Sequence, residues 1–162
     1  MQDSNAALVP RRWRLLNQKG QNLVEFAFIT VLVLVLFFGI IEFARALWTW
    51  NSIVHATREG ARYAVVNLPN TSNDDAIKNY VVYHDPSATA SSTPVVPGLS
   101  TSNVTVSYLN YDGSAASSKG SADVIQISVS NYTFGFLVPF FGSGLTLPAF
   151  TTTLPTEGLG SS

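Results

Sequence analysis

Few residues in this 162-residue chain have the types and spacing that catalysis or metal binding requires. Neither His55 nor His84 has a second ligand at metal-binding spacing, and the adjacent pair His84-Asp85 is a poor geometry for a catalytic dyad. The absence of cysteine from the sequence excludes thiol catalysis, disulfides and iron–sulfur sites. Ser143 lies between two glycines but lacks the strand–turn–helix context of a nucleophile elbow, and there is no glycine-rich phosphate loop. We therefore expect no enzyme, no catalytic residue, no metal site and no cofactor.

The composition and the distribution of charge indicate a chain that is handled at a membrane. Hydrophobic residues make up 46% of the sequence and charged residues 12%, about half the ~25% of an average globular protein. The first 20 residues carry four basic side chains against one acidic one, whereas the rest carries five basic against nine acidic. A basic leader followed by a mildly acidic remainder does not fit a protein that binds nucleic acid.

A continuous apolar segment covers residues 26–41 and carries no charge. As a helix it would span about 24 Å, slightly less than the ~30 Å hydrocarbon core of a bilayer. Glu25 and Glu42 bracket it, and neutralisation of Glu25 would extend the apolar stretch back to Gln21, to about 31 Å. The basic leader predicts a cytoplasmic N-terminus and an external C-terminal part. A core helix of a soluble protein is the alternative, although such a helix usually has a polar face.

A glycine and a lone carboxylate stand at the start of this segment. Gly20 precedes the apolar run, and Glu25 is the fifth residue after it. This is the form of a prepilin peptidase site, in which the cut lies before the hydrophobic segment and leaves that segment in the mature protein. Cleavage after Gly20 would make Gln21 the N-terminus, and its new α-amine and Glu25 could neutralise each other within one helix or between subunits. The alternative is that Glu25 is a charge at the membrane interface.

Three stretches of sequence, at residues 19–27, 39–45 and 56–64, resemble the TadE-like pseudopilins of bacterial tight-adherence (Tad/Flp) pilus systems. The block REGARYA at residues 58–64 is the most specific part of the resemblance. The resemblance implies a non-catalytic minor pilin that a prepilin peptidase processes and that helps to assemble or anchor a thin pilus.

The same resemblance implies a set of partners and a location. The partners would be the prepilin peptidase, other pilins or pseudopilins, Tad assembly components and the membrane, with no nucleic acid and no small-molecule substrate. The chain would cross the bacterial inner membrane once, with its C-terminal domain in the periplasm, or would be incorporated into the pilus.

Two other functions remain open on the sequence. One is a membrane-anchored extracytoplasmic binding module, for which the helix is only a tether. The other is a small secreted domain released by signal peptidase, because residues 44–46 have the small-x-small form of a cleavage site and would be cut after Ala46.

Residues 43–66 are predicted to continue the helix beyond the membrane. Apolar residues at helical spacing predict one buried face, formed by Phe43, Leu47, Trp50, Val54, Ala61 and Val65 with Thr57 in the gap. A second line holds only small residues four apart, namely Ser52, Ala56, Gly60 and Ala64, and such a stripe permits close packing. It could pack on the chain's own sheet or on another subunit. Trp48 and Trp50 follow the membrane exit and suit an aromatic belt.

The same helix carries a compact charged face made of Arg58, Glu59 and Arg62. Glu59 and Arg62 are three residues apart, so they could form an ion pair on the helix surface. The face could equally meet charged groups on a partner or remain solvated.

The predicted fold class is α+β, with one long transmembrane-plus-projecting helix and a small antiparallel sheet of about three strands. We expect a short helix capped by Ser72, a loop at residues 85–102, and strands within residues 104–108, 123–132 and 145–154. An apolar segment at residues 134–141, broken by a glycine and a proline, could face the membrane or a partner. The expected domains are a cleaved leader (1–20), a transmembrane helix (21–42), a projecting amphipathic helix (43–66), an extracytoplasmic α+β domain (67–154) and a loose tail (155–162).

Overall fold

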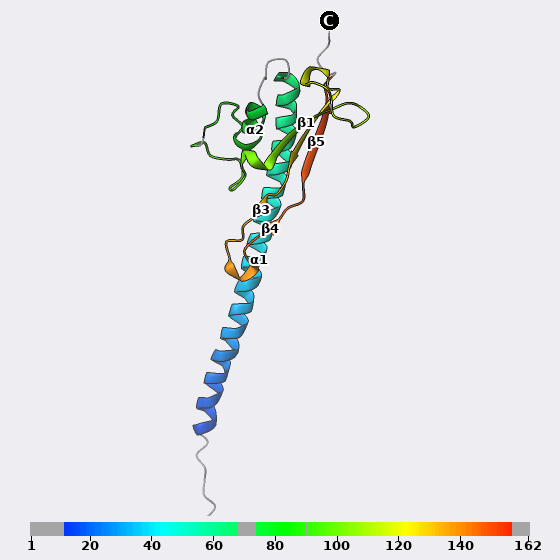
Figure 1. Cartoon of the computed structure of the whole chain (residues 1–162). Helices are drawn as coiled ribbons and strands as arrows, with labels where there is room; N and C mark the ends of the chain where they lie inside the picture. The colour runs from blue at the N-terminus through cyan, green and yellow to red at the C-terminus, as the bar shows by residue number, and fades with distance from the viewer. Residues whose placement is uncertain (1–11, 68–73, 90, 157–162) are drawn as a thin grey trace, which may run out of the picture. The chain divides into compact units, whose positions relative to one another are not determined.

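The computed structural model describes residues 12–67, 74–89 and 91–156 and divides the chain into two units, residues 1–41 and 42–162. Helix α1 (Arg12–Asn67) begins in the first unit and ends in the second. The second unit also contains helix α2 (Asp74–Tyr83) and the strands β1 (Val104–Leu109), β2 (Val124–Val129), β3 (Thr133–Phe134), β4 (Leu145–Thr146) and β5 (Phe150–Pro155) (Figure 1). Three single 3-10 turns complete it: η1 (Thr101–Asn103), η2 (Lys119–Ser121) and η3 (Pro139–Phe141). The predicted α+β fold, a long apolar helix with a three-stranded antiparallel sheet, is confirmed.

Helix α1 starts earlier than the sequence pattern predicted. It begins at Arg12, within the expected leader, and passes through Gly20 without a break. At the other end it stops at Asn67, two residues before Pro69, which disfavours helical geometry in the residue before it. The Asn67 side-chain amide donates a hydrogen bond to the Tyr63 carbonyl at 2.9 Å and so satisfies one carbonyl of the last turn.

The three-stranded sheet has the order β1-β2-β5, and both pairings are antiparallel. Alternation along the central strand places Ile125, Ile127 and Val129 on one fully buried face, as predicted. The opposite face is polar: the Gln126 amide donates to the Thr153 hydroxyl, and the Thr151 hydroxyl donates to Ser128. The sheet is therefore apolar only toward the helices.

The apolar segment after the central strand forms part of a second, two-stranded sheet. Strands β3 and β4 pair antiparallel, and residues 135–144 connect them. The third strand of the main sheet, β5, begins at Phe150, after Pro148. It extends through Pro155, where the loose tail was expected to begin, and the Thr156 amide donates to the Asp123 carbonyl at 2.8 Å. The expected Ser72 cap and residues 157–162 lie outside the described residues.

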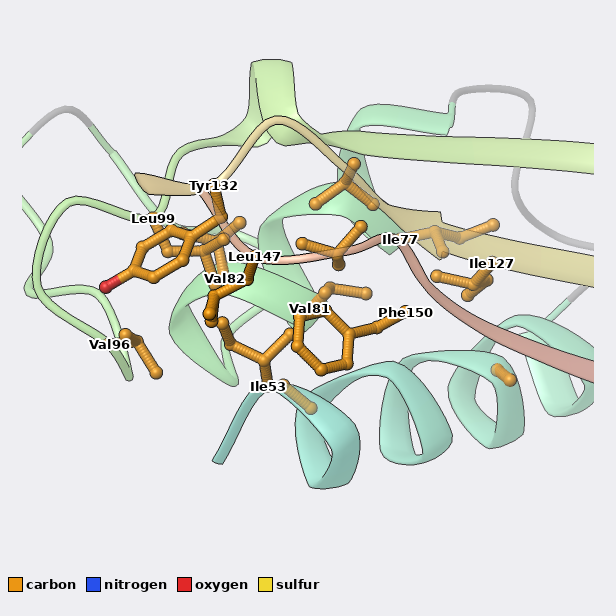
Figure 2. Close-up of a cluster of buried hydrophobic side chains, with 14 of the residues drawn as sticks. Ile53, Ile77, Val81, Val82, Val96, Leu99, Ile127, Tyr132, Leu147 and Phe150 are labelled. Atoms are coloured by element: carbon orange, nitrogen blue, oxygen red, sulfur yellow. The ribbon is translucent and has the colours of Figure 1, made fainter. Parts of the chain in front are cut away.

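The core of the second unit lies between α1, α2 and the main sheet. Figure 2 shows Ile53 of α1, Val81 and Val82 of α2, Ile127 of β2 and Phe150 of β5 converging there. Each of these side chains has an exposed fraction of 6% or less. Full burial of one such aliphatic side chain contributes about 1.5–3 kcal/mol to stability.

The buried face of α1 differs from the apolar face that spacing predicted. Phe43 and Leu47 point outward, with exposed fractions of 66% and 48%. Thr57 and Ala61 of the predicted face are buried, but the other buried positions include Thr49 and Ile53, which lie outside that face. The reason is that α2 and the sheet cover the side of α1 where small side chains allow a close approach, so that larger residues face outward. The buried Thr57 hydroxyl satisfies its hydrogen bonding with the Val54 carbonyl at 2.9 Å and with the Thr152 hydroxyl at 3.3 Å.

The small-residue stripe packs within the chain itself. Ala56, Gly60 and Ala64 are buried and Ser52 is partly buried. A Cβ atom added at Gly60 would lie 2.2 Å from Cγ2 of Val81 and 3.6 Å from Cδ1 of Ile127. Helix α2 therefore sits so close to α1 at this point that only glycine fits.

We predict that Gly60→Leu destabilises the second unit, because it forces a large side chain against Val81, a β-branched residue with little freedom to rotate. Overpacking of this kind costs about 1–3 kcal/mol. Gly20→Leu is the matched control, since an added Cβ at Gly20 has nothing within 4 Å. Denaturant unfolding of the full-length protein in detergent, followed by tryptophan fluorescence, should give a lower midpoint for Gly60→Leu and an unchanged one for Gly20→Leu. Equal midpoints would contradict the close packing.

Candidate functional site

The first unit presents an apolar helix surface with no protein cover. Within the candidate span, an 18-residue window has a mean hydropathy of 2.8 and no part of it is buried. Leu23, Phe28 and Ile40 have exposed fractions of 70%, 73% and 67%. The one polar side chain in the middle of the run, Thr30, satisfies its hydroxyl by donating to the Phe26 carbonyl at 2.8 Å. The helix is therefore long and apolar enough to cross a membrane.

Gly20 is a helical residue, but the packing described here does not require a glycine there. Apart from its chain neighbours and the backbone of its own helix, no atom of the described residues lies within 4 Å of a Cβ built at Gly20. A glycine inside a helix costs about 1 kcal/mol relative to alanine, so its presence needs another reason. Gln21, the predicted new N-terminus, is an exposed residue of the same helix.

Glu25 lies on the exposed surface of the same helix, five residues after Gly20. Its carboxylate forms no hydrogen bond and no ion pair with any residue that the structure describes. In an apolar environment an unpaired carboxylate is costly. Glu25 is therefore available to a cation that this chain does not supply from its described side chains.

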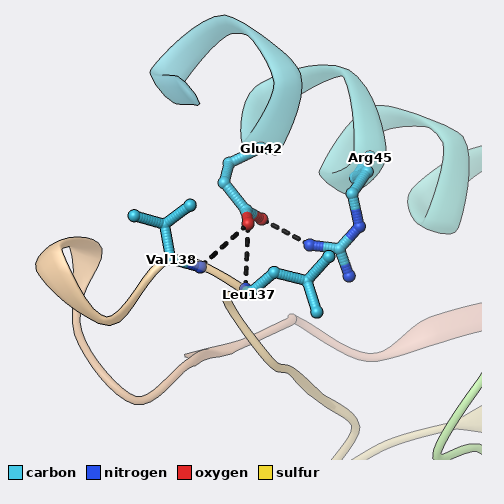
Figure 3. A network of polar contacts seen from close by, with 4 residues as sticks. All are labelled: Glu42, Arg45, Leu137 and Val138. Carbon is cyan, nitrogen blue, oxygen red and sulfur yellow. Dashed lines mark hydrogen bonds and ion pairs between the residues drawn. The ribbon is translucent and has the colours of Figure 1, made fainter. Parts of the chain in front are cut away.

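The second unit contains another carboxylate, that of Glu42. The sequence pattern identified it only as the charged residue that follows the apolar run. Glu42 is 4% exposed, and Figure 3 shows its side chain facing the β3–β4 connection. Its Oε1 accepts hydrogen bonds from the backbone amides of Leu137 at 2.8 Å and Val138 at 3.2 Å. Its Oε2 accepts one from Nη1 of Arg45 at 2.5 Å, which also forms an ion pair.

We call this arrangement the Glu42 clamp: the Glu42 carboxylate, the Arg45 guanidinium and the two amides. Hydrogen bonds to a charged group are about twice as strong as neutral ones. The clamp holds residues 137 and 138 against the helix, and the Arg45 guanidinium lies 5.0 Å from the centre of the Phe134 ring. A signal in the sequence was the i,i+3 spacing of Glu42 and Arg45, but the amides that complete the site are 95 and 96 residues away.

The three residues of the charged face lie together on the exposed side of α1. Arg58, Glu59 and Arg62 line a groove of about 420 Å³ with His55 of α1 and Thr152 and Leu154 of β5. Glu59 does not pair with Arg62 but faces His84, whose Nε2 is 3.0 Å from its carboxylate. Arg58 and Arg62 form no ion pair within the described part of the chain, so both guanidinium groups are open to a partner.

A second polar cluster fastens α2 to the sheet. The Asp74 carboxylate accepts hydrogen bonds from the Lys119 ammonium at 2.6 Å and from the Tyr108 hydroxyl at 2.7 Å. Partial burial opposes ionisation of Asp74, but these two hydrogen bonds and the charges of Lys119 and Lys78 outweigh it, so the pKa of Asp74 is lowered. Burial and the neighbouring Asp74 carboxylate raise the pKa of Tyr108.

These features define a class of protein: among the described residues one exposed apolar helix is long enough to span a membrane, and the part of that helix from Glu42 onward belongs to a small α+β unit. Residues 20–62 match the family model described as TadE-like protein, which confirms the resemblance to that family over this segment. No curated protein and no solved structure shows significant similarity to the chain.

The Glu42 clamp leads to a prediction about stability. Glu42→Ala leaves two amides and a guanidinium without their acceptor, which should destabilise the second unit by about 1–3 kcal/mol. Hydrogen exchange of the Leu137 and Val138 amides, measured by NMR on the full-length protein, should accelerate. Glu59→Ala is the matched control on the same helix, because its exposed contact with the His84 imidazole is worth about 0–1 kcal/mol at most. Unchanged exchange at both amides in Glu42→Ala would refute the clamp.

The Asp74 cluster leads to a prediction about pH. Because folding lowers the pKa of Asp74, its stabilising contribution is complete above its unfolded value of about 3.9 and is lost as the pH falls through the folded value. We expect the urea midpoint of the second unit to fall with pH below about 4, and to fall less steeply in Asp74→Asn. The comparison requires urea midpoints of the parent and the variant at several pH values between 3 and 7. Parallel curves would contradict the assignment.

Proposed function

We propose that the chain is a minor pseudopilin of a Tad/Flp-type pilus, processed by a prepilin peptidase and acting structurally in pilus assembly or anchoring. The observation that carries this proposal is the position of the family match. The match to TadE-like proteins begins at Gly20, the residue after which the spacing predicts cleavage, and continues through the apolar segment to Arg62. The leader lies before the matched residues. The apolar segment, which is retained after cleavage, lies within them.

The chemistry in this proposal belongs to the peptidase, and the chain is its substrate. Hydrolysis of the peptide bond between Gly20 and Gln21 would release the basic leader and create an α-ammonium group on Gln21. That cation would lie about one helical turn from Glu25, which has no partner among the described side chains. Mutual neutralisation of the two charges, within one chain or between neighbouring subunits, would lower the cost of holding both at the edge of the hydrocarbon core.

The second unit would be the part that meets other proteins outside the membrane. The basic leader favours retention of residues 1–20 in the cytoplasm, which would put the α+β unit in the periplasm. There the open guanidinium groups of Arg58 and Arg62 could bind acidic groups of other pilins, pseudopilins or Tad assembly components. The REGARYA block contains both arginines, and the segment that matches the family ends at the second of them, Arg62.

Release by signal peptidase after Ala46 fits the structure less well than cleavage after Gly20. Such a cut would fall inside the second unit and separate Glu42 and Arg45 from the loop that they hold. Ala46 itself is partly buried and packs against the core. Cleavage after Gly20 leaves every contact of the second unit in place.

The mature N-terminus tests the processing step. Mass spectrometry of the protein isolated from membranes should identify Gln21 as the first residue. Gly20→Leu should remain uncut, and because no described residue packs where its side chain would begin, the uncut protein should still fold. An N-terminus at Leu47, or normal cutting of Gly20→Leu, would overturn the proposal.

Glu25→Gln separates processing from assembly. The variant keeps the size and polarity of the side chain but removes the partner of the new α-amine, whose unpaired charge near the membrane core would cost up to ~3 kcal/mol. We expect Glu25→Gln to be cut after Gly20 and yet to fail to co-purify with pilus components. Asp112→Asn, which alters an exposed carboxylate in a turn of the second unit, serves as the control for loss of charge alone. Normal incorporation of Glu25→Gln would show that the carboxylate is only an interfacial charge.

A further inference from the structure

The loop held by the Glu42 clamp displays large apolar side chains to its surroundings. Leu137 and Phe140 have exposed fractions of 72% and 75%, among the highest of the large hydrophobic residues in the chain. Their backbone is not loose, because Glu42 binds the amides of Leu137 and Val138. The buried Glu42 carboxylate therefore fixes a loop whose large apolar side chains are exposed. Such exposure is unfavourable in water.

The adjoining stretch of α1 shows the same apolar exposure. Phe43, Leu47 and Trp48 are 66%, 48% and 58% exposed. Trp48 lies seven residues beyond Ile41, the last residue of the uncharged segment, which corresponds to about 10 Å along a helix axis. Trp50, by contrast, turns toward the sheet and meets Phe150 edge-on at 4.7 Å between ring centres.

The two charged residues in this stretch pair with each other, and only Arg45, with a 36% exposed side chain, reaches the surface. The Glu42 carboxylate is buried and accepts three hydrogen bonds, and Arg45 is its ion-pair partner. The next charged residue of α1 is Arg58, ten residues beyond Trp48. An ion pair that is neutral overall, with its carboxylate buried and hydrogen-bonded, is a form in which charge is tolerated at membrane depth.

We propose that the β3–β4 connection is a membrane-inserted loop, with Leu137 and Phe140 in the outer leaflet beside the point where α1 leaves the bilayer. Glu42 follows Ile41 directly, so the loop backbone is bonded to the first residue after the apolar span. This position favours a lipid bilayer as the partner of the loop. Glu42 is one residue beyond Ile41, or ~1.5 Å along the helix axis, so lipid around the end of the span would also reach Glu42. Trp48, with its amphipathic ring, suits the interface above.

The inserted loop would anchor the second unit in the membrane at a second point, in addition to the helix. This proposal rests on membrane anchoring of α1 but not on cleavage after Gly20. Its experiment can therefore fail while the processing step holds, and the reverse is also true.

The experiment uses the absence of native cysteine from the sequence. Single cysteines at positions 137 and 140 of the full-length protein are labelled with a nitroxide and reconstituted into vesicles of phosphatidylethanolamine and phosphatidylglycerol. Accessibility to oxygen, which concentrates in lipid, is compared with accessibility to a water-soluble nickel chelate. Phe28→Cys, at a 73% exposed position of the span, is the lipid reference, and Val66→Cys, at a 60% exposed position near the end of α1, is the aqueous reference.

We expect the oxygen-to-nickel ratio at Leu137→Cys and Phe140→Cys to exceed that at Val66→Cys several-fold and to approach that at Phe28→Cys. A ratio equal to that of Val66→Cys, with Phe28→Cys still in lipid, would overturn the proposal and leave the anchor intact. Protection from both reagents that disappears when the protein is diluted with lipid would overturn it in favour of a second protein copy. An aqueous ratio at Phe28→Cys would overturn both the loop insertion and the membrane anchor.

Discussion

One helix has to satisfy two different environments, and the change between them falls at Glu42. From Phe26 to Ile41 every residue except Thr30 is apolar and most side chains are exposed, a surface that suits lipid. After Glu42, one side of the helix is buried beneath α2 and the sheet. A carboxylate at the junction would be unfavourable in either environment if it were unpaired. The Glu42 clamp resolves this conflict, because three donors satisfy the charge within the protein.

The elements of the fold follow from local patterns that a reader of the sequence can find. Alternation of Ile125, Ile127 and Val129 identified the central strand, and the uncharged run from Phe26 identified the apolar helix, since both signals depend only on near neighbours. The buried face of α1 was less predictable. Spacing placed Phe43 there, because a count of hydrophobic residues cannot show that α2 approaches through small residues instead.

The polar sites were harder to predict than the fold because their partners are far apart in the chain. The Glu42 acceptor and the Leu137 amide are separated by 95 residues, and Tyr108 and Asp74 by 34. In each case one partner is a backbone amide or a tyrosine hydroxyl, groups that give no charge signal in a sequence. The charged face was visible at Arg58, yet Glu59 turned out to face His84 of the following segment.

Gly20 and Gly60 lie in the same helix, but close packing within the described residues explains only Gly60. Both carry the helix cost of about 1 kcal/mol relative to alanine. At Gly60 the cost has a structural cause, because Val81 lies where a Cβ would be. At Gly20 nothing within the described chain occupies that space. A glycine that the described packing does not require is compatible with the proposed cleavage after Gly20, because a peptidase would have to approach the backbone at that residue.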